Sequence, residues 1–195
     1  AERHARRAER AMAIGEYAEA ATLYQKAYRL TSIKEKEQRG RLAFLMGEAY
    51  RRYGYSSRAL GAYRTAERYK YVDTLTYLRI GQMSLLKGDY KGAEKAFQQH
   101  IFQQPDNAAA AIGLQSAEHA VATRNAGSLY TVRLAGNFNS NRADYSPALL
   151  GTDKEQQLYF TSNRSAAAGN TLSGITGQKP GDLFVVRQDE KGRWK

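Results

Sequence analysis

Small and aromatic residues recur at a fixed spacing over positions 1–123. Four positions repeat with a period of 34, so that Gly47, Gly54, Ala59 and Tyr63 are followed by Gly81, Gly88, Ala93 and Phe97. An upstream copy of the same pattern consists of Gly15, Ala20, Tyr24 and Ala27. A period in the thirties is typical of helical solenoids, in which each unit buries its apolar face by stacking on a neighbour.

Within each unit the apolar residues have helical periodicity. Ala59, Tyr63 and Ala66 follow the i, i+4, i+7 spacing that places side chains on one helical face. Gly54 is expected to end the preceding helix, because glycine tolerates the left-handed conformation found there. Pro105 is expected to end the last helix of the third unit, and residues 107–123 are expected to form a further repeat helix or a cap.

The first unit departs from the period in two ways. The interval from Ala20 to Ala59 exceeds the period by five, so an insertion is expected to lengthen the second helix of this unit or its loop near Ser32–Gln38. The first helix has His4, Arg7 and Ala11 at positions that are usually large and apolar, so we expect it to be truncated or exposed.

Residues 126–195 have a different pattern, in which short apolar runs alternate with Asn, Asp, Ser, Gly and Pro. Such runs predict strands separated by turns. The predicted strands are Leu129–Leu134, Ala148–Leu150, Leu158–Thr161 and Leu183–Arg187, and Ser165–Gly181 is predicted to be a long loop.

Composition narrows the possible functions without selecting one. The formal net charge of +11 would attract nucleic acid, anionic lipid or an acidic protein, and most of the excess lies in residues 1–125, with 21 Lys and Arg against 13 Asp and Glu. The absence of cysteine excludes disulfides, thiol chemistry and cysteine-based zinc sites. No run approaches the roughly 20 apolar residues that span a bilayer. Both ends of the sequence are abrupt, and we expect it to be a fragment of a longer protein.

The repeated units resemble the tetratricopeptide repeat. Residues 87–97 (KGDYKGAEKAF) and 15–20 (GEYAEA) are close to the consensus of that family. The resemblance implies about three repeats with a capping helix over residues 1–123. It also implies a concave surface made by the first helices, with these partner-binding residues: Arg41, Phe44, Glu48, Arg51, Arg52, Leu75, Leu78, Arg79 and Gln82.

An aromatic and aliphatic floor beside four arginines would suit an acidic protein segment or a C-terminal carboxylate. Guanidinium groups pair with carboxylates through two parallel hydrogen bonds, which makes arginine a suitable residue for such recognition. The alternative interpretation is that each of these arginines simply belongs to a solvated face.

Three motifs in the second half resemble one blade of a TolB-like β-propeller. They are residues 144–147 (DYSP), 158–164 (LYFTSNR) and 181–186 (GDLFVV), preceded by residues 137–140 (NFNS). The expected organisation is therefore an α+β multidomain chain. It would comprise a helical repeat domain over residues 1–123, a linker with a first strand over 124–143, and about one truncated blade over 144–195.

The order of repeats and propeller resembles a family of Bacteroidota cell-envelope proteins that end in an OmpA-like domain. Within it, the sequence is similar to the PorE-like accessory subunits of the type IX secretion system. The resemblance implies a non-enzymatic periplasmic scaffold at the outer membrane, with or without a lipid anchor, whose partners are envelope or secretion-system subunits. It also implies peptidoglycan contact only through a domain that the sequence does not contain.

Signs of other chemistry are weak, and no cofactor or metal is expected. His4, His100 and His119 are scattered, and His100 stands at a core position of its repeat. Asp144, Ser146 and Ser162 are more easily interpreted as residues that fix turns and strand ends than as catalytic groups. Two alternatives remain open: a periplasmic propeller enzyme or sugar-binding protein whose site lies elsewhere, and an RNA-binding repeat protein. A further alternative is that the basic face binds the surface of a membrane.

Overall fold

The computed structural model describes residues 1–71, 73–123, 130–131, 134, 138–152 and 156–195. The described residues form seven α-helices and three β-strands. Their contacts divide the chain into two compact units, one with the helices and one with the strands. The strand predicted over Leu129–Leu134 and much of the predicted linker over 124–143 lie outside the described residues.

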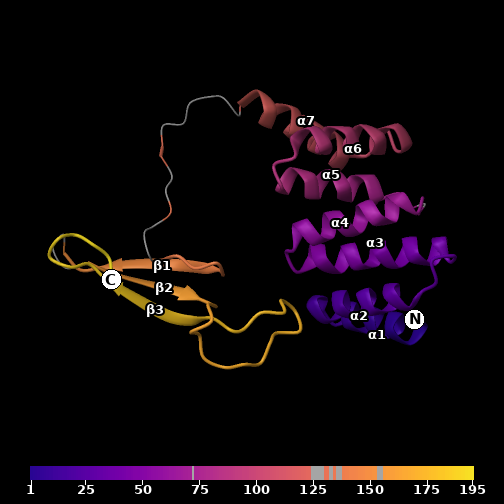
Figure 1. Ribbon diagram of the computed structural model, residues 1–195. Helices are drawn as coiled ribbons and strands as arrows, with labels where there is room; N and C mark the ends of the chain where they lie inside the picture. Colours follow the sequence, from indigo (N-terminus) through magenta and orange to yellow (C-terminus); the bar gives the residue numbers. More distant parts are fainter. Residues whose placement is uncertain (72, 124–129, 132–133, 135–137, 153–155) are drawn as a thin grey trace. The chain divides into compact units, whose positions relative to one another are not determined.

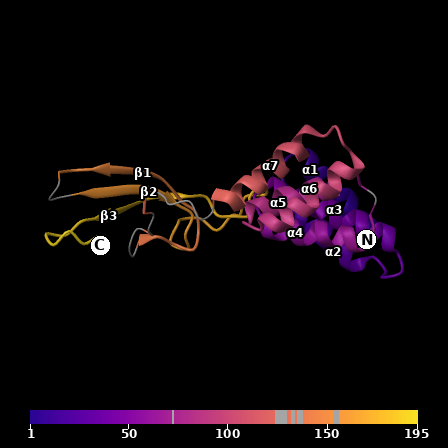
Figure 2. The same cartoon turned by 90° about the horizontal axis from the view of Figure 1, so that it is seen from above.

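The helical unit is a stack of antiparallel helices in chain order (Figure 1). Each helix packs against the next one, and α5 also contacts α7. In the view of Figure 2 the helices overlap one another along the stack. Their bounds are α1 Glu2–Ala13, α2 Tyr17–Leu30, α3 Lys36–Arg52, α4 Ser56–Arg68, α5 Thr76–Leu86, α6 Tyr90–Gln103 and α7 Ala108–Thr123.

The repeat period corresponds to one recurring contact between a glycine and an aromatic ring. A Cβ atom added at Gly47 would lie 2.7 Å from Cε1 of Tyr63, and one added at Gly81 would lie 2.6 Å from Cε1 of Phe97. Both rings are fully buried. The small residue therefore lets the second helix of each pair bring its ring directly against the backbone of the first helix.

The first and last helices extend this arrangement. Ala8 and Tyr24 hold the corresponding places in α1 and α2, and both are buried. At the other end, Gly113 of α7 faces the ring of Phe97 from the side opposite its own pair, so Phe97 lies between α5 and α7. Residues 108–123 thus form the further helix that the sequence predicts, and this helix covers the last aromatic ring of the array.

Glycine ends the first helix of each pair, as predicted. Gly15, Gly54 and Gly88 have φ of +83°, +89° and +72°, in the left-handed region that residues with a Cβ rarely adopt. Asp89 then begins α6, where its side chain accepts a hydrogen bond from the backbone N–H of Gly92 at 3.0 Å.

The insertion in the first unit lies in α3, which corrects the location expected from the sequence. α3 begins at Lys36, well ahead of Gly47, whereas α5 begins at Thr76, close to the equivalent Gly81. The second helix is hardly lengthened, since α2 has 14 residues and α4 has 13. The added first turns of α3 pack on the α4–α5 connection, where the backbone of Gly40 approaches Tyr69 and Tyr71.

Of the two alternatives expected for the first helix, truncation is wrong and exposure is confirmed. α1 is a 12-residue helix that packs against α2 through the buried side chains of Ala8 and Ala11. Small residues suffice here because α1 packs mainly against this one helix. Its remaining sides are exposed and rich in arginine.

The second unit contains a three-stranded antiparallel sheet in the order β1-β2-β3 (Figure 2). The strands are β1 Asp144–Leu150, β2 Gln157–Ser162 and β3 Asp182–Arg187, and each contains one predicted strand. A bulge interrupts β1 between Tyr145 and Ala148, where Ser146 has a φ of +52°. The predicted loop over Ser165–Gly181 contains no helix or strand. A propeller blade typically has four strands, and the described residues form three.

Aromatic rings fill one side of this sheet. The ring of Phe160 in β2 stacks on that of Phe184 in β3, with centroids 6.0 Å apart. Phe138 packs against Phe160 at 6.0 Å and against Trp194 at 5.9 Å. The aromatic cluster gives the small sheet an apolar core.

A single arginine joins the aromatic cluster to the strand ends. The guanidinium of Arg164 lies 4.9 Å from the Phe160 ring and 4.8 Å from the Phe184 ring. It donates hydrogen bonds to Asp144 Oδ1 at 2.9 Å and to Ser162 Oγ at 2.9 Å. Burial alone would raise the pKa of Asp144, but the hydrogen bonds it accepts hold that pKa well below its usual range. Asp144 and Ser162 therefore fix the start of β1 to the end of β2.

Replacing Gly81 with alanine should destabilise the helical unit by about 1–2 kcal/mol, because the added methyl overlaps the Phe97 ring. Gly61→Ala in α4 is the matched control, since nothing lies within 4 Å of its added Cβ. Alanine should stabilise that exposed helix position by about 0.5–1 kcal/mol. Urea unfolding followed by circular dichroism in the far ultraviolet measures both, and equal effects at the two sites would contradict the packing model.

Replacing Arg164 with lysine should destabilise the sheet unit by about 2 kcal/mol, because lysine keeps the charge but loses the planar fork and the stacking. Trp194 is the only tryptophan of the chain, so its fluorescence reports on this unit during urea unfolding. Arg187→Lys on an exposed position of β3 is the control. A similar unfolding midpoint for both variants would refute the role given to Arg164.

Candidate partner-binding surface

The partner-binding residues predicted from the sequence lie on the first helices of the second and third pairs. Five of them are on α3 and the remainder lie on α5 or immediately before it. Residues 41, 44, 48 and 52 of α3 follow a helical spacing of three or four, which brings them toward one side of the helix. Their surroundings divide them into four groups: a charged cluster around Glu48, two core residues, two exposed arginines, and Leu75, which is half-buried against the core.

Glu48 is the centre of the charged cluster. Its Oε2 accepts a hydrogen bond from Arg51 Nη2 at 2.7 Å, and its Oε1 accepts one from Tyr63 Oη at 2.6 Å. Arg79 of α5 donates from Nε to Oε1 of the same carboxylate at 2.8 Å, and from Nη1 to Gln82 Oε1 at 3.0 Å. One carboxylate thus joins α3, α4 and α5, with its side chain only 14% exposed.

The groups around Glu48 favour the ionised form of its carboxylate. Burial alone would raise the pKa of Glu48, but the hydrogen bonds from Arg51 and Tyr63 and the charge of Arg79 outweigh it and lower that pKa. The hydrogen bond to Glu48 raises the pKa of Arg51, and burial together with the bond to Glu48 raises that of Tyr63. Arg51 and Arg79 therefore share one carboxylate, which compensates one of their two positive charges.

Phe44 and Leu78 are core residues, which differs from the exposed apolar floor expected from the sequence. They are only 6% and 5% exposed. The Phe44 ring packs on the rings of Tyr63 and Tyr71, at centroid distances of 5.6 and 5.7 Å. The physical reason is the close packing of the first helices against the second ones, which draws these side chains inward.

Arg41 and Arg52 are the two predicted arginines that remain accessible. Arg41 Nη2 lies 3.4 Å from Glu9 Oε1 of α1, in a pair whose two side chains are about half exposed. The guanidinium of Arg52 lies 5.7 Å from the centre of the Tyr17 ring of α2. Both contacts are weak and solvent-accessible, so either arginine can turn toward a partner.

Arginine–tyrosine contacts recur elsewhere in the helical unit, and sequence reasoning did not anticipate them. Arg39 lies 4.1 Å from the Tyr28 ring and donates from Nε to Tyr69 Oη at 2.8 Å. Arg58 lies 5.2 Å from the Tyr55 ring. The side chains of Tyr28, Tyr55 and Tyr69 are thus already in contact with arginines of the helical unit.

Other kinds of site receive no support from the described residues. Across the described ranges, no group of His, Asp and Glu is arranged to hold a metal ion. His100 is fully buried in α6, and burial lowers its pKa. Among the helices described, none has the length and apolar character needed to cross a membrane.

Replacing Glu48 with glutamine should destabilise the helical unit by about 2 kcal/mol at neutral pH, because two arginines lose their anionic partner. Tyr63→Phe is the matched control, which removes one hydrogen bond and should cost about 1 kcal/mol. The folded pKa of Glu48 is lowered, so its contribution is complete above the ordinary carboxyl pKa and is lost as the pH falls through the folded value.

Urea unfolding of both variants at several pH values tests this assignment. The difference between the unmodified protein and the Glu48→Gln variant should shrink as the solution is acidified, while the effect of Tyr63→Phe at neutral pH should remain the smaller of the two. A Glu48→Gln effect that does not change with pH would show that the carboxylate charge is not what stabilises the cluster.

Comparisons with known proteins support the fold of the helical unit. No protein-family model and no curated protein matches the sequence. Among solved structures, the chain is similar to the Sgt2 tetratricopeptide repeat domain from Aspergillus fumigatus, with a TM-score of 0.51 and 21% identity over 72% of this chain and 90% of that one.

It is also similar to the first tetratricopeptide repeat domain of Spaghetti (RPAP3) bound to the HSP90 peptide SRMEEVD, with a TM-score of 0.51 and 20% identity over 61% of this chain and 90% of that one. At such identities the likeness concerns the fold alone. The helical unit therefore has the fold of a tetratricopeptide repeat array, the architecture that its repeat period predicts.

Proposed function

We propose that the helical unit is a protein-interaction module that binds an acidic segment of a partner protein along the first helices of its pairs. The tetratricopeptide repeat fold supports a binding role, because such arrays use their repeated helices as extended binding surfaces. The single observation that carries the choice of partner is the pair of accessible arginines, Arg41 and Arg52, on α3.

The cluster around Glu48 contributes to this function by holding the surface rigid. The hydrogen bond from Arg79 to Glu48 links α5 to α3 and helps to fix the relative position of the two helices. A binding surface whose helices are already in place loses less conformational freedom when a partner binds. In this proposal the inner arginines Arg51 and Arg79 position the surface, and the outer arginines contact the partner.

The chemistry of a known complex makes an acidic peptide a suitable probe. The RPAP3 domain in the similar structure is bound to a peptide that ends in Glu-Glu-Val-Asp. Carboxylates at that spacing can pair with guanidinium groups through charge-assisted hydrogen bonds. We therefore expect this protein to prefer peptides with several carboxylates over their amide counterparts.

The double variant Arg41→Gln, Arg52→Gln should weaken binding of the SRMEEVD peptide about tenfold, as expected when two exposed ion pairs are lost. Arg29→Gln, Arg68→Gln is the control with the same charge change at exposed positions on α2 and α4. Fluorescence anisotropy with a labelled peptide measures the affinities. Equal losses of peptide affinity in the two double variants would contradict the proposed site, because they would show that only the net charge of the protein attracts the peptide.

We further propose that this module belongs to a periplasmic scaffold associated with the outer membrane, within type IX secretion machinery. Support comes from the order of the sequence motifs, with tetratricopeptide repeats followed by the DYSP and LYFTSNR motifs of a propeller blade. The sheet supports the propeller part, since Tyr145, Leu149 and Leu183 are about half exposed or more and would be covered by a neighbouring sheet.

In-cell crosslinking in a bacterium that produces this protein tests the envelope proposal. Recovery of secretion-system subunits from the outer-membrane fraction is expected, and the Arg41→Gln, Arg52→Gln variant should reduce it. Recovery of RNA that weakens steeply with salt would instead indicate a nucleic-acid-binding function and contradict the proposal.

A further inference from the structure

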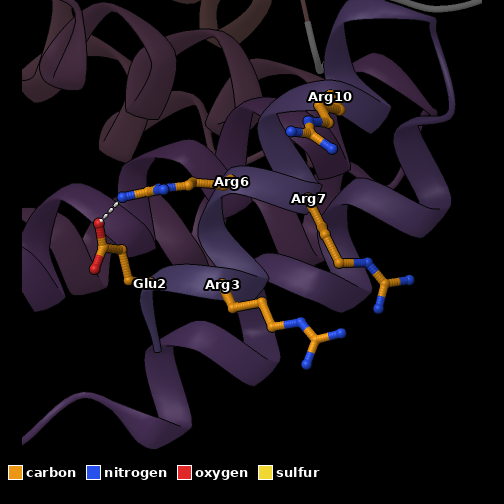
Figure 3. A pocket seen from close by; sticks show the side chains of 5 residues that line it. All are labelled: Glu2, Arg3, Arg6, Arg7 and Arg10. Atoms are coloured by element: carbon orange, nitrogen blue, oxygen red, sulfur yellow. Dashed lines mark hydrogen bonds and ion pairs between the residues drawn. The ribbon is translucent and has the colours of Figure 1, made fainter.

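Four arginines line one side of α1 and surround a surface hollow of about 420 Å³. They are Arg3, Arg6, Arg7 and Arg10, which we call the α1 arginine face (Figure 3). Arg6 forms an ion pair with Glu2, the one acidic residue of the hollow. The side chains of Arg3 and Arg7 extend away from the helix in Figure 3. Within the part of the chain that the structure describes, Arg3, Arg7 and Arg10 have no acidic partner.

The repeat shows which residues hold the equivalent positions in the other helix pairs. When the units are aligned on their turn glycines, Arg3, Arg7 and Arg10 correspond to three positions in each of α3 and α5. These positions hold Leu42, Met46 and Ala49 in α3, and Thr76, Ile80 and Met83 in α5. All six are buried or half-buried.

A neighbouring helix accounts for the difference in burial. α3 packs against the preceding α2 and α5 packs against the preceding α4, whereas no helix precedes α1 among the described residues. The residues that are covered in α3 and α5 but exposed in α1 therefore mark the side on which the array receives a preceding helix. The α1 arginine face therefore holds positions that pack against a preceding helix in the other pairs, and it is positively charged.

The charge of this face exceeds what an exposed helix side requires. Solubility needs only a polar side, which residues of mixed charge provide. Here Arg3 and Arg7, and Arg6 and Arg10, are like charges at i, i+4, an arrangement that destabilises a helix. Carboxylates supplied from outside the chain would remove this repulsion, and the fork of each guanidinium is suited to receive them.

We propose that the α1 arginine face binds an acidic helix of a partner protein, which lies along α1 with its carboxylates toward the arginines. The partner helix would present carboxylates three or four positions apart, to match Arg3, Arg7 and Arg10 over a length of about 10 Å. This surface is distinct from the one around Arg41 and Arg52, and its occupant is independent of the peptide proposed there.

The composition of the hollow favours a protein partner over nucleic acid or lipid. No aromatic side chain lines it, so it offers no platform on which bases could stack. No apolar side chain lines it either, so it has nothing to insert into a membrane interface.

The test uses the whole chain and two synthetic helical peptides of equal length. One peptide has Glu at i, i+4 and i+7, and the other has Gln at those three places. The Glu peptide should bind, and the triple variant Arg3→Gln, Arg7→Gln, Arg10→Gln should weaken that binding about tenfold or more. The control is Lys26→Gln, Arg29→Gln, Lys95→Gln, which removes three charges at exposed positions of α2 and α6 and should leave the affinity nearly unchanged.

Two further measurements separate binding at this face from binding at the other surface and from loss of folding. The Arg41→Gln, Arg52→Gln variant should bind the Glu peptide normally, which separates this surface from the one in the proposed function. The triple variant should unfold at an equal or higher urea concentration, since it relieves repulsion within α1, so that lost binding cannot be attributed to unfolding.

Three results would overturn the proposal. One is equal affinity for the Glu and Gln peptides, and another is equal loss in the control variant. The third is failure of the Glu peptide to bind while a short single-stranded RNA, or a phosphatidylglycerol vesicle, binds in a manner that the triple variant abolishes.

Discussion

The helical unit depends on the contact between a backbone without a side chain and a buried aromatic ring. Gly47 against Tyr63 and Gly81 against Phe97 bring the two helices of a pair closer than any side chain would allow. The close approach buries the whole ring, and burial of an aromatic ring is among the largest favourable contributions that one residue can make. The ring of Phe97 also receives Gly113 of α7, so the same ring joins its own pair to the following helix. Helix length, loop length and surface charge vary between the units, whereas this contact recurs.

The fold could be predicted from the sequence largely because this contact has a fixed period. Glycines and aromatic residues one period apart locate both helices of a pair, and the glycines at the turns locate their ends. The place of the insertion in the first unit could not be obtained in that way. The interval between Ala20 and Ala59 shows that it exists but does not say which segment absorbs it. The answer depends on Gly40, which allows the added turns of α3 to lie against Tyr69 and Tyr71.

The candidate site was harder to predict, because position on a helix face does not specify what surrounds a side chain. Glu48 and Arg51 stand at i and i+3, a spacing at which an ion pair can be expected from the sequence. The contacts of Glu48 with Tyr63 and Arg79 cross between helices and depend on tertiary packing, as does the burial of Phe44 and Leu78. The arginine-rich side of α1 was visible in the sequence only as a departure from the usual apolar pattern. Its meaning emerges when the same positions are compared in α3 and α5.

The carboxylate of Glu48 has a consequence for how variation in this protein should be interpreted. It joins α3 to α5 through Arg79 and to α4 through Tyr63, and therefore helps to hold in place the surface that α3 and α5 form. A substitution at Glu48, or at Tyr63 behind it, can change the affinity for a partner that neither residue touches. In a population of natural or selected variants, altered specificity can thus arise from residues beneath the binding surface while every contact residue stays the same.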